Sequence, residues 1–336
     1  MKLIILLYVP RSGSTFLSSQ LAKKYSKILV MPEIRLPKLM LEKEANVAIR
    51  YHELQRVLEN DHQISSLDIT EEDIADIYKN SQSLRPESIL LSLADLIAQR
   101  KGRQFDAVVY KCGSAGLWWP ALKASYPTAS FIHVHRDVRA VVNSALHSQR
   151  PYHPGEKMGR GDPWFRAKGW NRYVTGMQKL TQAGEPIIQV SYEALCHDPT
   201  AVLDNLINQL KLDVGVAVGD EGISVATSEQ DIHRNVNKPP LKGRLDAWQG
   251  ELKLWQIVVS EHLATEGMNT LGYEKRISKT ISAISYSACL FYGFIFHVYA
   301  TLKFKLSRTL KHSFSPMKLY SRIVHRLRTR NLRSRW

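Results

Sequence analysis

The sequence predicts an α/β protein in which helices flank a central parallel sheet, followed by a C-terminal apolar and basic helical appendage. Short apolar runs alternate with helix-length segments, which is the pattern of parallel βαβ units. The first run leads into a polar turn that contains glycine, and a long uncharged run stands near the C-terminus. We therefore expect one domain over residues 1–274 and the appendage over residues 275–336.

Four apolar runs are expected to form the sheet. Leu3–Val9 is apolar at successive positions, as in a strand that is covered on both faces, and it is too short for a spanning helix or a signal peptide. A helix should begin near Ser14. The later strands are expected at Phe105–Tyr110, Ala129–Val134 and Pro186–Val190.

The segments between these runs are mostly helical in pattern. Residues 39–100 contain Thr70-Glu-Glu-Asp73, which resembles a capping box, and Pro86 stands at the first turn of a later helix. Another helix is expected after Asp198-Pro199.

Two further segments complete the predicted domain. Residues 246–263 are expected to form a final core helix. Residues 149–162 are rich in proline, glycine and charge without periodicity, which predicts a mobile loop beside the site.

The net charge of +15 does not indicate a nucleic-acid partner. Fourteen of the 46 Lys/Arg residues follow the last acid, Glu274, so residues 1–274 hold 32 basic and 31 acidic residues. Cys112, Cys196 and Cys289 are an odd number without metal-ligand spacing. Free thiols indicate a reducing compartment, so we expect a cytoplasmic protein, either soluble or peripheral on the cytoplasmic membrane face.

The turn after the first strand reads Pro-Arg-Ser-Gly-Ser-Thr and is predicted to bind an anion. A strand that enters a helix through a tight turn directs several N–H groups to one point, at the positive end of the helix dipole. Arg11 adds a charge, Gly13 allows close approach, and Ser12, Ser14 and Thr15 add hydroxyl groups. The alternative is an ordinary connection with Ser14 as N-cap.

This turn differs from the nucleotide-binding loop of kinases, because it lacks the leading glycine and the lysine. A transferring sulfuryl group carries less charge than a γ-phosphoryl group and can be stabilised by cationic side chains and N–H donors. We therefore expect a P-loop-like sheet that needs no metal ion.

A second polar cluster follows the third long strand. Arg136 stands where strand gives way to helix, and Ser144 lies eight residues further, on the same helix face, so together they are predicted to hold a 3′-phosphate. An ion pair of Arg136 with Asp137 at a helix start is the alternative. His135-Arg136-Asp137 matches the His-Arg-Asp of the protein-kinase catalytic loop. The asparagine of that loop has no match, because Asn143 stands one position after its expected place.

Together these stretches resemble the sulfotransferases that use 3′-phosphoadenosine 5′-phosphosulfate (PAPS), over residues 2 to about 273. The resemblance implies that the loop from Arg11 to Phe16 binds the 5′-phosphosulfate, and that Arg136 and Ser144 bind the 3′-phosphate. It also implies a place at the cofactor for Tyr192, in a strand that ends in Y-E-x-L. Residues 233–248 resemble the late loop that closes over the cofactor, with His233 and Lys238 as its contacts.

Among the branches of this family, the sequence looks closest to the tyrosylprotein and carbohydrate sulfotransferases. Glu33 and Arg35 lie 22 and 24 residues after Arg11, as the catalytic Glu and neighbouring Arg of the tyrosylprotein branch do. The resemblance implies that Glu33 accepts the proton of the acceptor hydroxyl, that Arg11 and Lys111 neutralise charge on the transferring group, and that Arg35 binds the substrate. His233 is the next candidate for the base.

Other functions remain open at this point. A kinase or NTPase of the same architecture is the second enzyme class, and a membrane- or polyanion-binding protein without catalysis is the third reading. The acceptor of a sulfotransferase would be a peptide tyrosine or a glycan hydroxyl. Both a monomer and an oligomer are compatible with these patterns.

The tail contains an uncharged run of 22 residues, Ile281–Leu302, and 11 Lys/Arg residues follow it. The run is long enough to cross a bilayer. An apolar helix in the headgroup region, with its basic residues on anionic lipid, is the placement we expect. A spanning helix, a core helix and a basic arm on a polyanion are the alternatives.

Overall fold

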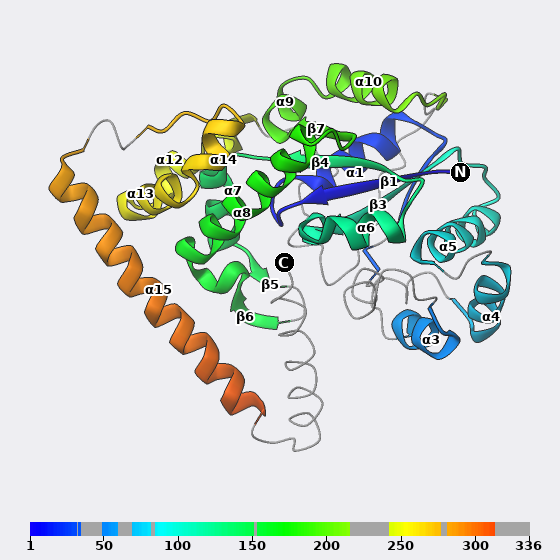
Figure 1. Ribbon diagram of the computed structural model, residues 1–336, viewed down its shortest axis with the longest axis horizontal. Helices are drawn as coiled ribbons and strands as arrows, with labels where there is room; N and C mark the ends of the chain where they lie inside the picture. The colour runs from blue at the N-terminus through cyan, green and yellow to red at the C-terminus, as the bar shows by residue number, and fades with distance from the viewer. Residues whose placement is uncertain are drawn as a thin grey trace.

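The computed structural model describes residues 1–31, 33–34, 49–59, 69–81, 85–150, 153–215, 242–276 and 281–312. Its centre is a five-stranded parallel sheet in the order β2-β3-β1-β4-β7 (Figure 1). The predicted α/β fold with a flanked parallel sheet is therefore confirmed. The strands of the sheet are β1 (Lys2–Tyr8), β2 (Ile28–Val30), β3 (Ala107–Gly113), β4 (Ser130–His135) and β7 (Ile187–Ser191).

The helices lie on both faces of the sheet and beyond its carboxyl edge (Figure 1). In Figure 1, α1, α9 and α10 lie above the sheet, whereas α5 and α6 lie below it. The helices are α1 (Ser14–Lys24), α3 (Tyr51–Glu59), α4 (Glu71–Asn80), α5 (Pro86–Arg100), α6 (Trp119–Ser125), α7 (Val138–Leu146), α8 (Pro163–Gln182), α9 (Tyr192–His197), α10 (Pro199–Leu210), α12 (Trp248–Glu251), α13 (Leu254–Leu263), α14 (Thr265–Thr270) and α15 (Ala283–His312).

Strand β1 is central and buried on both faces. Ile4 and Leu6 pack with the helices of one face, and Leu3, Ile5 and Leu7 pack with those of the other. This alternation follows from the two-residue period of a strand. Because β1 pairs with both β3 and β4, the turn that follows it lies at the middle of the carboxyl edge.

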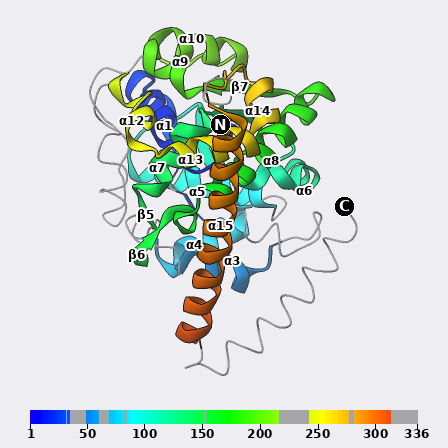
Figure 2. The same ribbon diagram turned by 90° about the vertical axis from the view of Figure 1, so that its left-hand side faces the viewer.

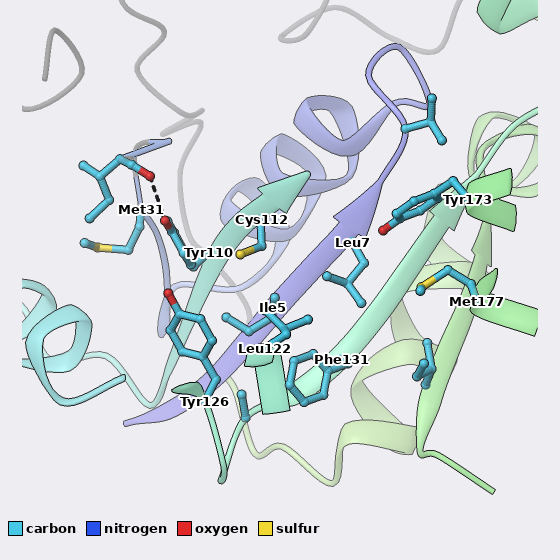
Figure 3. Close-up of a cluster of buried hydrophobic side chains, with 14 of the residues drawn as sticks. Ile5, Leu7, Met31, Tyr110, Cys112, Leu122, Tyr126, Phe131, Tyr173 and Met177 are labelled. Carbon is cyan, nitrogen blue, oxygen red and sulfur yellow. Dashed lines mark hydrogen bonds between the residues drawn. The ribbon is translucent and has the colours of Figure 1, made fainter. Parts of the chain in front are cut away.

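The core below the sheet also fixes the segment that follows β2. Tyr110, Tyr126 and Phe131 are fully buried there (Figure 3). The hydroxyl of Tyr110 donates to the carbonyl of Ile34 over 2.7 Å. This bond holds Glu33 and Ile34 beside β3.

Several predicted boundaries are confirmed. Helix α1 begins at Ser14, and the capping box of Thr70 with Asp73 is present at the start of α4. Pro86 opens α5, and the Asp198 side chain caps α10 by accepting from the N–H of Ala201. The three cysteines are free, as expected.

The loop predicted over residues 149–162 is wrong in part. Its two short strands, β5 (Gln149–Arg150) and β6 (His153–Lys157), pair antiparallel, and a 3₁₀ turn follows at Met158–Gly161. Backbone pairing of two short strands needs no apolar alternation, so the periodicity did not reveal them.

The single helix predicted over residues 246–263 is two helices, α12 and α13. Leu252 and Lys253 between them are extended, and the side chain of Gln256 accepts from the N–H of Lys253 to start α13. The break keeps Trp248 and Leu252 buried together with the apolar face of α13. Strand β2 was not predicted, because three residues are too few for a periodic signal.

Helix α15 is the apolar helix of the tail. It has 30 residues and lies along α13 and α8 (Figures 1 and 2). Residues 283–307 are long and apolar enough to cross a membrane by length and composition alone. The division into domains near residue 274 stays a prediction.

A buried histidine makes the fold sensitive to acid. His133 in β4 lies fully buried, with Nδ1 2.7 Å from the Oε1 of Gln189 on β7. The pKa of His133 is lowered from 6.5 to about 3. Burial is the largest cause, and the neighbouring His135 is the next. The unfolded chain therefore binds a proton that the folded protein excludes, so stability is full above about pH 6.5 and falls as the pH decreases.

We expect the free energy of unfolding to fall by roughly 1.4 kcal/mol through this residue between about pH 7.5 and about pH 5.5. In His133→Asn the amide can still donate to Gln189, and this part of the pH dependence should disappear. Urea denaturation at both pH values measures it, with His52→Asn, an exposed histidine of α3, as the control. An equal fall in wild type and His133→Asn would assign the titration to other groups.

Candidate active site

The turn between β1 and α1 directs backbone N–H groups out from the carboxyl edge of the sheet. Arg11 has φ 82° and Gly13 has φ 91°, so the chain turns sharply, and the N–H of Ser12 donates to the carbonyl of Val9 over 3.1 Å. Helix α1 begins directly afterwards at Ser14. The first N–H groups of a helix have no partner within it, and they carry its positive dipole end.

Tyr192, the first residue of α9, packs directly on this turn. A Cβ atom at Gly13 would lie 2.1 Å from Cδ2 of the Tyr192 ring, so only glycine fits. The ring also meets Phe16 edge-on at 6.1 Å, and the guanidinium of Arg136 lies 4.3 Å from its centroid. Burial raises the pKa of Tyr192 to about 12, so the phenol stays neutral.

Three arginines converge on the turn. Nη1 of Arg136 donates to the carbonyl of Arg11 over 3.3 Å, and Nε of Arg11 donates to the hydroxyl of Ser144 over 2.9 Å. Burial is the main cause that lowers the pKa of Arg11 to about 10, and the charges of Arg136 and Arg166 contribute to the same shift. Burial also lowers the pKa of Arg166, which comes from α8. Like charges held together in a buried place favour an anionic ligand.

Some buried polar atoms of this cluster lack a hydrogen-bond partner within the described part of the chain. These atoms are the hydroxyl oxygen of Ser12, Nε of Arg136 and Nε of Arg166. Buried polar groups are nearly always satisfied in proteins, so such atoms mark a place where a ligand supplies the partner. Hydroxyl and guanidinium donors beside a helix N-terminus fit phosphate and sulfate oxygens.

The alternative ion pair of Arg136 with Asp137 does not form. The Asp137 carboxylate caps α7 by accepting from the N–H of Arg139, and it also binds the Arg139 guanidinium at 2.6 Å. Arg139 in turn contacts Glu261 at 2.7 Å. Since Asp137 is engaged on the far side, it leaves Arg136 directed to the turn.

A carboxylate and a lysine lie on the other side of the turn. Nζ of Lys111, at the end of β3, donates to Oγ1 of Thr15 over 3.3 Å and lies 3.3 Å from Oε1 of Glu33. The hydroxyl of Tyr8 donates to the same oxygen of Glu33. The side chain of Lys111 is 8% exposed and that of Glu33 is 36% exposed, so the carboxylate is the member that solvent and ligands reach.

The structure thus brings most of the predicted site residues together, from the carboxyl ends of β1, β3, β4 and β7 and the segment after β2. Arg35, His233 and Lys238 lie outside the described residues. Within the described ranges, no group of three or more His, Cys, Asp or Glu side chains is placed to hold a metal ion.

Two residues of the site were not predicted from the sequence. Arg166 follows the Asp162-Pro163 helix start, in a segment without a motif, and Tyr8 lies within an apolar strand. A polar aromatic at the end of a buried strand was the available signal for Tyr8. No local pattern indicates Arg166, since only the packing of α8 brings it to Arg11.

A parallel sheet with a tight turn into a helix and buried cations at its carboxyl edge defines a protein of the P-loop-like α/β class, and this edge fits a phosphate or sulfate group. A model of the sulfotransferase family matches residues 4–215. The chain belongs to the sulfotransferase family and is a transferase, and PAPS is the usual donor in this family.

Solved structures agree with this fold. The chain is similar to the sulfotransferase domain from the Synechococcus PCC 7002 olefin synthase, with 21% identity, a TM-score of 0.52, and coverage of 82% of this chain and 95% of that one. It is also similar to the sulfotransferase domain from the curacin biosynthetic pathway, with 18% identity, a TM-score of 0.51, and coverage of 82% and 99%. No curated protein sequence gives a significant match.

The contact of Gly13 with Tyr192 can be tested by a substitution that adds one methyl group at position 13. Gly13→Ala combines a left-handed φ with overlap against the ring, so we expect it to lower the free energy of unfolding by about 2–4 kcal/mol. Gly102→Ala is the matched control, because Gly102 has φ 59° with open space around it, and about 1 kcal/mol is expected there.

Thermal or urea denaturation measures both variants. In a Tyr192→Ala background, the further loss caused by Gly13→Ala should be smaller than in the wild type, because the overlap has disappeared while the strained φ remains. Equal losses at Gly13 and Gly102 would contradict the close contact.

Proposed function

We propose that the protein transfers the sulfuryl group of PAPS to the hydroxyl of an acceptor, with Glu33 as general base. The observation that carries this proposal is the run of contacts Thr15–Lys111–Glu33, 3.3 Å at each step, which places a carboxylate beside the anion-binding turn. Family membership supports the reaction class.

The donor would be held by the turn and by the cationic and hydroxyl groups beside it, among which the Ser12 hydroxyl and Nε of Arg136 lack partners in the described protein. The N–H groups and hydroxyls from Ser12 to Phe16 bind the 5′-phosphosulfate in this proposal, and Arg136 and Ser144 bind the 3′-phosphate. Tyr192 keeps the Arg136 guanidinium in place through its ring face. When bound, the donor supplies the sulfuryl group and a bisphosphate leaving group.

Glu33 takes the proton of the acceptor hydroxyl as the acceptor oxygen bonds to sulfur and the bond from sulfur to the bridging oxygen breaks. The bridging oxygen leaves with the electron pair of that bond. Arg11 and Lys111 neutralise the charge that develops on it, and their fixed positions mean that little reorganisation is needed.

The surroundings of Glu33 suit this role. Lys111 and the Tyr8 hydroxyl both contact Oε1, so the carboxylate is oriented. Burial and the Glu33 charge raise the pKa of Tyr8 far above its usual value, so Tyr8 remains a donor and does not compete for the proton. The partial exposure of Glu33 leaves room for an acceptor.

For the acceptor we propose a peptide tyrosine or a glycan hydroxyl, with Arg35 as an acceptor contact. His233 and Lys238 are proposed to contact the donor from the late loop. We propose a cytoplasmic location, because free cysteines are stable in a reducing compartment.

Donor binding is tested with adenosine 3′,5′-bisphosphate. The bisphosphate should raise the melting temperature of the wild type, and Arg136→Ala should weaken its binding by about 10- to 100-fold, because a charged hydrogen-bond donor is lost. Arg172→Ala, an exposed arginine on α8, is the control and should bind like the wild type.

Stabilisation by Mg·ATP alone would instead favour a kinase or NTPase. If neither ligand stabilises the protein, the turn has only a structural role.

The base is tested with Glu33→Gln, which keeps the shape and removes the proton acceptor. Sulfate transfer from labelled PAPS should fall by about 10²- to 10⁴-fold. Binding of the bisphosphate should be nearly unchanged, and Glu72→Gln, exposed on α4, should retain full activity.

If Glu33→Gln retains turnover, the base is wrongly assigned, and His233→Gln becomes the next variant to measure.

A further inference from the structure

Helix α15 has two apolar faces, and the described part of the chain covers one of them. Gly293 and Ala300 are buried against the domain. Ile284, Phe291, Ile295, Leu302 and Leu306 are 83%, 69%, 50%, 60% and 62% exposed. With about 100° per residue, these five positions lie within roughly 40° of the direction opposite Gly293. We name them the outer stripe.

The covered face is held closely at its middle. A Cβ atom at Gly293 would lie 2.4 Å from Cγ2 of Val259 on α13, so the two helices touch there. Trp255 of α13 lies between Tyr292 and Phe296, at 5.0 and 5.2 Å between ring centroids.

Polar and aromatic contacts extend this packing toward both ends. His262 of α13 hydrogen-bonds the hydroxyl of Tyr286 over 2.9 Å. His297 contacts the buried carboxylate of Asp162 and stacks on Trp164 at 5.9 Å. Further along, the guanidinium of Arg160 lies 4.4 Å from the ring of Phe304. Helix α15 is therefore part of the domain surface over several turns (Figure 2).

Basic residues flank the outer stripe near its C-terminal end. Lys303 and Lys305 are exposed and lie on either side of the stripe on the helix circumference. Residues 303–335 hold 11 Lys/Arg, and no acidic residue follows Glu274. Tyr292 and Tyr299 are more than half exposed beside the stripe, and such rings favour the membrane–water interface.

We propose that α15 binds flat on an anionic lipid bilayer, with the outer stripe at the boundary of headgroups and acyl chains. The apolar side chains leave water there, and the basic residues meet lipid phosphates and carboxylates. The stripe runs over 22 residue steps, which correspond to about 33 Å of helix. This inference does not depend on the proposed transfer reaction.

Two other arrangements fit the structure less well. To span the bilayer, α15 would have to leave Trp255, Asp162 and Trp164, and His297 would enter hydrocarbon. A second copy that packed α15 against α15 would bring the lysines of two helices together, and α15 contains no acidic residue to meet them.

Vesicle flotation of the full chain tests the proposal. We expect binding to vesicles of phosphatidylcholine mixed with phosphatidylserine, much weaker binding to phosphatidylcholine alone, and release by high salt. The variant Phe291→Gln/Ile295→Gln/Leu302→Gln should lose at least about tenfold in partitioning, because three apolar side chains no longer insert.

A charge variant measures the electrostatic contribution to vesicle binding separately from the apolar contribution. Lys303→Glu/Lys305→Glu should lower binding to the mixed vesicles by roughly tenfold or more. Its matched control, Lys79→Glu/Lys101→Glu, changes two exposed lysines around α4 and α5 and should bind nearly like the wild type. Circular dichroism and bisphosphate binding report whether each variant is folded.

The proposal is overturned if the wild type does not float with the mixed vesicles, or if the triple variant floats equally well. A dimer that dissociates in the triple variant, without flotation of the wild type, would assign the stripe to a second copy. Resistance of the cellular protein to alkaline carbonate extraction would assign a spanning helix.

Discussion

The packing of the Tyr192 ring on Gly13 leaves no room for a side chain between them, and the rest of the site depends on this contact. It joins the turn after β1 to the end of β7, and Arg136 from the end of β4 lies on the same ring. Three strand ends are thereby held at one place. A small displacement of the ring would change the position of Arg136 and, through the Arg11 carbonyl, the turn itself.

Patterns that follow from backbone chemistry were predictable from the sequence. The apolar run of β1, the helix start at Ser14 and the capping box at Thr70 each have a local signal, and the structure has all three. The convergence of Arg11, Arg136 and Ser144 was also predictable, because the carboxyl ends of parallel strands share one edge of the sheet.

Other features depend on packing between distant segments. Arg166 reaches Arg11 only because α8 crosses the carboxyl edge, and the break between α12 and α13 arises where burial of Leu252 outweighs helix continuity. The pairing of β5 with β6 lacks any apolar signature. The outer stripe of α15 could not be separated from its covered face by composition, since both faces are apolar and only the packing distinguishes them.

The clustering of buried arginines has a consequence for turnover. The bisphosphate that remains after transfer keeps the phosphate groups that Arg11 and Arg136 are proposed to neutralise, and it loses only the sulfuryl group. The empty site returns to a state of uncompensated like charge, so departure of this anion is opposed by the same electrostatics that favour its arrival. If the proposed reaction holds, the bisphosphate would therefore act as a product inhibitor, and the rate at which it leaves would limit the catalytic cycle.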